Sequence, residues 1–173
     1  FGDNGLLSRD GMKKPSFYAF HFMHFTKSWL LAKTEHALLS TDGRNNFTIT
    51  CHNCKQFNYR YMIKEENDIS VDDLEEVYED LDAIHLKFKI DHVENGDYLM
   101  RIYYVNRENG SVQDLWKDMQ YLKNLSRGES AYMLRTATPR VELRQIKVED
   151  HILRLETKLK AHEIRMLDIS YQY

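Results

Sequence analysis

The C-H-N-C motif at residues 51–54 is the most conspicuous spacing in this 173-residue chain that could support chemistry. Such a pair of cysteines can be half of a structural zinc site or a redox-active dithiol. A zinc site needs a second pair of ligands at matching spacing, and the chain has no other cysteine. A redox pair favours a first cysteine at a helix N-terminus, whereas Cys51 continues the strand pattern of Phe47 and Ile49. We therefore expect Cys51 to face the core, and neither cysteine to bind metal or form a redox pair.

Two histidines and one acidic run are the other candidates for metal binding. His21 and His24 lie three residues apart, which places them on one side of a helix. The sequence does not complete the H-E-x-x-H pattern of zinc proteases, so we expect both rings to contact a neighbouring domain. The run at residues 72–80 lacks the alternating ligands and central glycine of a calcium loop, and is typical of a solvated helix face. The sequence thus predicts no metal and no cofactor.

The acidic residues offer no recognisable pair for acid–base catalysis. Glycoside hydrolysis needs two carboxyl groups placed across the scissile bond, one of them with a raised pKa. Nearly all of the 27 acidic residues occur in charged stretches that we expect to face outward. The sequence also contains no nucleophile elbow, phosphate loop or dinucleotide fingerprint. We therefore expect no catalytic residue in this chain and no enzymatic activity.

Charge and composition argue against two further classes of protein. A net charge of -3 is unfavourable for a nucleic-acid-binding surface, which needs clustered Lys and Arg. No run approaches the roughly 18 apolar residues of a membrane span. Two cysteines do not make a disulfide scaffold and favour a reducing compartment, so we expect a cytoplasmic location. Because the chain begins at Phe1 rather than Met, we also expect a segment upstream of it.

An aromatic helix is predicted near the start of the chain. It begins at Pro15, a favoured first helical position, and extends to about Trp29. Its apolar stripe follows helical spacing, and further apolar side chains flank the stripe. A helix that is apolar nearly all round requires burial on more than one side, and we expect no matching layer within the chain. The predicted contact residues, for a missing domain or a second copy, are Phe17, Tyr18, Phe22, Phe25 and Trp29.

The rest of the chain is dominated by a period of two, which is typical of half-buried strands. We predict strands at residues 47–51, 84–90, 98–105, 141–148, 152–159 and 164–171. The third of these is apolar on both faces, which predicts a central position in a sheet. Asn95-Gly96 predicts a hairpin turn before it. Three short helices are predicted at serines followed three residues later by an acidic residue, namely Ser70, Ser111 and Ser126. These elements predict a mainly β protein with short helices, an antiparallel β-sandwich.

The order of the segments resembles glycoside hydrolase family 39. Residues 1–7 and 11–20 resemble the stretch of family 39 β-xylosidases that enters the last barrel helix. The other similar stretches, including the family's first long sandwich strand and its final strand pair, are residues 47–58, 95–98, 106–111, 114–116 and 159–164. The resemblance implies a β-sandwich preceded by one helix left over from a (β/α)8 barrel. Residues 1–31 would be the last-helix segment, and residues 32–173 an accessory sandwich with inserted helices.

The resemblance also implies that the catalytic residues lie outside this chain. In the family the acid/base and nucleophile glutamates project from earlier barrel strands, so no catalytic residue is carried over. Two kinds of parent protein share this region: the β-xylosidases, and AraC-type transcriptional regulators in which a helix-turn-helix region precedes a family-39-like module. Residues 51–58 and 107–116 look closer to the regulators. Cys54 departs from the aromatic residue usual there.

Three functions remain open at this point. The first is a non-catalytic C-terminal structural and interaction domain of an AraC-type regulator, in contact with an upstream barrel or with a second copy. The second is the accessory sandwich of a family 39 β-xylosidase. The third is a carbohydrate-binding sandwich, and its aromatic platform would draw on Tyr98, Tyr103, Tyr104 or Trp116. These four aromatic residues lie in patterns typical of a core, so we favour the third function least.

Overall fold

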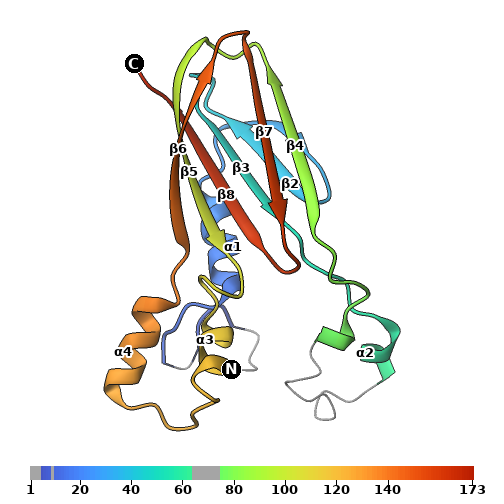
Figure 1. Ribbon diagram of the computed structural model, residues 1–173, viewed down its shortest axis with the longest axis vertical. Coiled ribbons are helices and arrows are strands. Elements are labelled where there is room, and N and C mark those ends of the chain that lie inside the picture. Colours follow the sequence, from blue (N-terminus) through green and yellow to red (C-terminus); the bar gives the residue numbers. More distant parts are fainter. Residues whose placement is uncertain (1–4, 9, 64–74) are drawn as a thin grey trace.

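The computed structural model describes residues 5–8, 10–63 and 75–173, and within them eight strands form two packed antiparallel sheets (Figure 1). The larger sheet has the order β1 (Trp29–Lys33), β2 (Ala37–Thr41), β3 (Phe47–His52), β8 (Ile164–Tyr171), β5 (Gly96–Val105) and β6 (Arg140–Val148). The smaller sheet pairs β4 (Ile84–Asp91) with β7 (Ile152–Leu159). The prediction of a mainly β protein with an antiparallel sandwich and short helices is confirmed.

The main hydrophobic core fills the space between the two sheets. Alternate residues of β7 are buried there, and their neighbours in the strand are exposed, as the period of two predicts. The β7 residues in this core are Leu153, Leu155 and Leu159. Burying one large apolar side chain stabilises by roughly 1.5–3 kcal/mol, so these contacts hold the small sheet against the large one.

The central position predicted for residues 98–105 is confirmed, because β5 pairs with both β6 and β8. The hairpin predicted at Asn95-Gly96 is wrong, because β4 and β5 lie in different sheets. The turn instead crosses between the sheets, where the Asn95 side chain accepts a 2.8 Å hydrogen bond from the His151 backbone N–H. Gly96 has φ of 144°, and a Cβ there would lie 2.8 Å from the Tyr171 ring. This close approach requires glycine.

Four helices complete the described fold: α1 (Pro15–His24), α2 (Tyr59–Ile63), α3 (Val112–Asp118) and α4 (Arg127–Thr136). The last three lie at one end of the sandwich, at the bottom of Figure 1. The predicted starts of α3 and α4 are confirmed, because Ser111 accepts from the Asp114 N–H and Ser126 accepts from the Glu129 N–H, each at 3.2 Å. The start of the helix predicted at Ser70 lies outside the described residues, and residues 75–77 form a short 3-10 turn. No described helix is long and apolar enough to cross a membrane.

The N-terminal helix is shorter than predicted. It ends at His24, and the chain then enters the sheet, where the Lys27 backbone N–H donates to the Ser40 hydroxyl at 2.9 Å. Trp29 therefore begins the edge strand β1 instead of ending a helical stripe. The domain boundary predicted after residue 31 consequently falls inside a strand. The predicted elements also omitted α2, β1 and β2.

Candidate interface and buried polar network

One side of α1 packs on the outer face of the six-stranded sheet. Tyr18 and Phe22 are 4% and 1% exposed, and they form a cluster with Val105, Ile164 and Met166. The Tyr18 hydroxyl also donates to the Ala137 carbonyl at 2.8 Å, and burial raises the pKa of this phenol. The expectation that the helix finds no partner layer in the chain is therefore wrong for these two side chains, because the outer face of β5 and β8 provides that layer.

Large apolar side chains remain exposed on the rest of α1 and on β1. We define the α1–β1 apolar surface as Phe20 (63% exposed), Met23 (56%), Phe25 (43%), Trp29 (65%), Leu30 (56%) and Leu31 (50%). All five residues of β1 are exposed, and β1 lies at the edge of its sheet. Edge strands with exposed apolar side chains readily pair with another chain unless something covers them. This surface is therefore the strongest candidate for a protein contact.

The predicted contact residues of the first helix divide between these two environments. Phe25 and Trp29 belong to the α1–β1 apolar surface, whereas Tyr18 and Phe22 belong to the interior. Phe17 is partly buried against the α1 cluster. Sequence reasoning missed Leu30 and Leu31, because it extended the helix to Trp29 and counted only helical spacings.

The two histidines of α1 take part in ring contacts. The His21 ring stacks on Phe17 with 6.0 Å between ring centroids, and it meets Phe25 edge-on at 5.2 Å. His24 lies 6.1 Å from the same Phe25 ring. Among the described residues, no group of three or more His, Cys, Asp or Glu side chains could hold a metal ion. Contact of these histidines with a neighbouring domain stays a prediction.

The cysteines of the C-H-N-C motif lie in different surroundings. Cys51 is fully buried in the main core with Phe47 and Ile49, so the predicted inward orientation is confirmed. Burial raises the pKa of Cys51 to about 12, which keeps it as an unreactive thiol at neutral pH. Cys54 is exposed, and its backbone N–H donates to His52 Nδ1 at 3.3 Å. That neither cysteine binds metal or acts as a redox pair stays a prediction.

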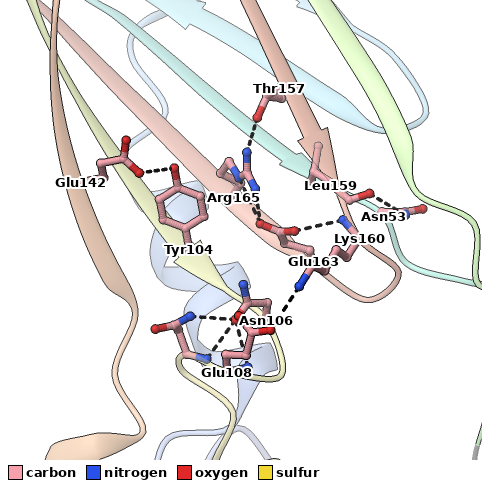
Figure 2. Close-up of polar contacts among 11 residues, drawn as sticks. Asn53, Tyr104, Asn106, Glu108, Glu142, Thr157, Leu159, Lys160, Glu163 and Arg165 are labelled. Atoms are coloured by element: carbon pink, nitrogen blue, oxygen red, sulfur yellow. Dashed lines mark hydrogen bonds and ion pairs between the residues drawn. The ribbon is translucent and has the colours of Figure 1, made fainter.

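The turn between β7 and β8 holds a buried ion pair that was not predicted (Figure 2). Glu163 is 2% exposed, and its carboxylate accepts from Arg165 Nε at 3.1 Å and from the Lys160 backbone N–H at 3.0 Å. Arg165 also donates to the Thr157 hydroxyl. The guanidinium carbon lies 4.4 Å from the centroid of the Tyr104 ring. The expectation that acidic residues face outward is thus wrong for Glu163.

Asn53 connects this turn to both sheets. Its backbone N–H donates to the Glu163 carbonyl at 2.9 Å, and its carbonyl accepts from the His162 N–H at 2.8 Å. Its side-chain amide donates to the Asp82 carbonyl at 3.0 Å and to the Leu159 carbonyl at 3.3 Å. These bonds join the end of β3 to the segments around β4 and β7. The network therefore fixes the polar end of the sandwich. Because the Glu163 carboxylate in this network already accepts from several donors, it is poorly suited to proton transfer.

The four aromatic residues considered for a carbohydrate platform do not form one surface. Tyr98 is fully buried in the main core, and Tyr104 packs at the edge of that core. Tyr103 packs against the α1 cluster, and Trp116 packs in a separate cluster with α4. A carbohydrate platform needs ring faces that are exposed together. The geometry of these four residues therefore does not favour the third function.

Comparison with known proteins identifies relatives of this chain by sequence. No protein-family model matches the sequence. An uncharacterized HTH-type transcriptional regulator of Staphylococcus aureus strain MRSA252 is 23% identical over 160 residues, which are 92% of this chain and 20% of the regulator. The regulator of the same description from strain COL is 22% identical over the same length.

Solved structures agree with this fold over nearly the whole chain. The GH39 enzyme from Xanthomonas axonopodis pv. citri superimposes with a TM-score of 0.74 at 18% identity, over 97% of this chain and 32% of the enzyme. The chain therefore has a GH39-type sandwich fold. A monomeric β-xylosidase from Caulobacter crescentus gives a TM-score of 0.77 at 16% identity, over 99% of this chain and 34% of that enzyme. The chain thus spans about a fifth of the length of these regulators and about a third of these enzymes.

Proposed function

We propose that this chain is a non-catalytic structural and interaction domain of a cytoplasmic AraC-type transcriptional regulator. In this proposal, the α1–β1 apolar surface contacts the rest of the polypeptide. That its relatives are described as transcriptional regulators supports a regulator as the full-length protein. The GH39-type fold supports an accessory sandwich as the type of domain. The single observation that carries the proposal is the exposure of six large apolar side chains on α1 and β1. Because these side chains are about half exposed, burying what remains exposed would stabilise a contact by about 5–10 kcal/mol before its entropic costs.

The first test of the proposal is the association of the isolated chain. Without the rest of the polypeptide, we expect the exposed surface to drive self-association at micromolar concentration. Phe20→Ser combined with Trp29→Ser should make the chain markedly more monomeric in light scattering, because both side chains are more than half exposed. Their exposure also predicts little change in the melting temperature.

Leu134→Ser on α4 is the matched control, because Leu134 is an exposed apolar residue, at 48%, on a different element. We expect this variant to associate like the unmodified chain. Equal association of the double variant and the unmodified chain would contradict the role of the α1–β1 apolar surface. The same double variant in the full-length polypeptide should loosen the domain contact, which increased hydrogen exchange of β1 amides would reveal.

A second prediction concerns catalysis. We expect the purified chain to hydrolyse aryl β-xylosides no faster than buffer does. The one buried carboxylate among the described acidic residues, Glu163, is held by Arg165 and by the Lys160 backbone. Retaining and inverting glycosidases both need a second carboxyl group about 5–9.5 Å away, across a bound sugar. Turnover that one Asp or Glu substitution abolishes would contradict this prediction.

The alternative function is the accessory sandwich of a family 39 β-xylosidase. It is favoured by one observation, the similarity of this fold to a GH39 enzyme and a β-xylosidase. The sequence of the full-length gene product distinguishes the two proposals. A helix-turn-helix region upstream would support the regulator, whereas a complete barrel with two catalytic glutamates would support the enzyme. The apolar surface serves the same contact role in both.

A further inference from the structure

A cavity of about 280 Å³ lies at the polar end of the sandwich, where α3 meets the turn between β7 and β8. Its wall combines side chains from segments far apart in the sequence. Arg107 follows β5, Asp114 and Lys117 belong to α3, Tyr121 follows α3, and His162 lies in the β7–β8 turn. Tyr78 and Val105 add apolar surface to the same wall. The volume lies near the lower limit of small-molecule pockets.

Two residues of this wall are held in an unfavourable state. Tyr121 and His162 have φ of 54° and 61°, in the left-handed region that non-glycine residues rarely adopt. The Tyr121 hydroxyl and His162 Nε2 are also buried without a hydrogen-bond partner among the described residues. A small rotation of either ring toward the cavity would let a ligand provide the missing partner.

The charges of the wall indicate which ligand would fit. The carboxylate of Glu75 is paired with Arg107, and that of Asp114 accepts from the Ser111 hydroxyl, so both wall carboxylates already have donors. Lys117 makes no ion pair within 4 Å in the described part of the chain, although its charge is near enough to Glu75 to help lower the pKa of that carboxyl. The wall therefore has donors in excess of free acceptors.

The state of His162 agrees with this excess of positive charge. Burial lowers the pKa of His162, and the charges of Arg107 and Lys55 lower it further, while Glu75 and Asp114 oppose them. The imidazole is therefore neutral at pH 7, and it can donate or accept according to its tautomer. A ligand that brings acceptors and one negative charge matches this wall better than a cation does.

We propose that this cavity binds a small organic carboxylate. The ligand's carboxylate would pair with the Lys117 ammonium and accept from the Tyr121 hydroxyl, and its remaining atoms would lie against Tyr78 and Val105. The site goes beyond the contact role proposed above and does not depend on which parent protein contains the chain.

The test uses three pairs of probes that differ only in charge: benzoate and benzamide, lactate and lactamide, and glucuronate and glucuronamide. Titration calorimetry on the 173-residue chain should detect at least one acid at millimolar concentration. The matching amide should bind about tenfold more weakly or not at all, because charge-assisted hydrogen bonds are about twice as strong as neutral ones. Equal binding of an acid and its amide would show a site for neutral ligands and overturn the proposal. Failure of all three acids to bind would overturn it as well.

Two lysine variants locate the binding to this cavity. Lys117→Met should weaken binding of the acid about tenfold, since it removes the cation and keeps the length of the side chain. Lys123→Met changes another exposed lysine, outside the cavity wall, and should leave binding unchanged. Both residues are exposed, so neither variant should disturb folding. Equal weakening by both variants, or by neither, would contradict the assigned site, whatever the α1–β1 apolar surface proves to contact.

Discussion

Phe22→Ala should lower the free energy of unfolding by about 3–5 kcal/mol, the usual cost of truncating a buried phenylalanine. Phe22 is 1% exposed, and it packs in the cluster that joins α1 to the six-stranded sheet. Its ring centroid lies 6.0 Å from that of Tyr103 on β5. The truncation leaves a cavity that this cluster can fill only in part, so α1 should detach at a lower denaturant concentration. Chemical denaturation followed by circular dichroism measures the change.

Phe20→Ala provides the comparison, because Phe20 belongs to the same helix and is 63% exposed. We expect it to change stability by no more than about 0.5 kcal/mol, as is usual for surface substitutions. The same variant should reduce self-association, which Phe22→Ala should not do directly. Similar losses of stability for the two variants would mean that α1 is not docked as described. The pair thus separates the side of α1 that belongs to this domain from the side that is free for a partner.

The environment of α1 could be predicted only in part. That the helix requires burial on more than one side stays a prediction, and the layer that buries Tyr18 and Phe22 was missed. Val105, Ile164 and Met166 belong to strands that are apolar on both faces, and such strands must be covered on both faces. That signal was present in the sequence. A strand that is apolar on both faces indicates a central strand, and it also indicates a covering layer on the outer face, which α1 provides.

Period and capping signals predicted the elements of the sandwich more reliably than their connections. Local patterns account for β7, for the burial of Cys51, and for the serine N-caps of α3 and α4, because each depends on neighbouring residues in the chain. The crossing at Asn95-Gly96 could not be predicted in this way. A tight turn can join paired strands or strands of opposite sheets, and only contacts with His151 and Tyr171 distinguish them.

The candidate sites show the same limit. Trp29 is exposed, and its role in a contact stays a prediction. Because β1 was not recognised, its neighbours Leu30 and Leu31 were overlooked. The polar end of the sandwich could not be predicted at all. Glu163 and Arg165 are two residues apart at the start of a strand, and such a pair is usually exposed. Its burial depends on Thr157, Lys160 and Asn53, which the fold brings together.

The second large effect is expected at this ion pair. Arg165→Met should destabilise the chain by about 3–5 kcal/mol, because it leaves the Glu163 carboxylate buried without its counter-ion. The substitution also removes the hydrogen bond from the guanidinium to Thr157 and its stacking on Tyr104. The exposed pair of Arg154 and Asp150, at 2.7 Å, is the matched control. Arg154→Met should cost less than about 1 kcal/mol, since exposed ion pairs contribute little.

Combining Glu163→Gln with Arg165→Met tests whether the loss comes from the unpaired charge. Glutamine keeps an oxygen that can accept from the Lys160 backbone N–H, which donates to Glu163 at 3.0 Å. The double variant removes both buried charges, so it should regain at least half of the stability lost in Arg165→Met, as measured in a double-mutant cycle. A double variant no more stable than Arg165→Met would show that packing of the arginine on Tyr104 and Thr157, rather than neutralisation of Glu163, holds the turn in place.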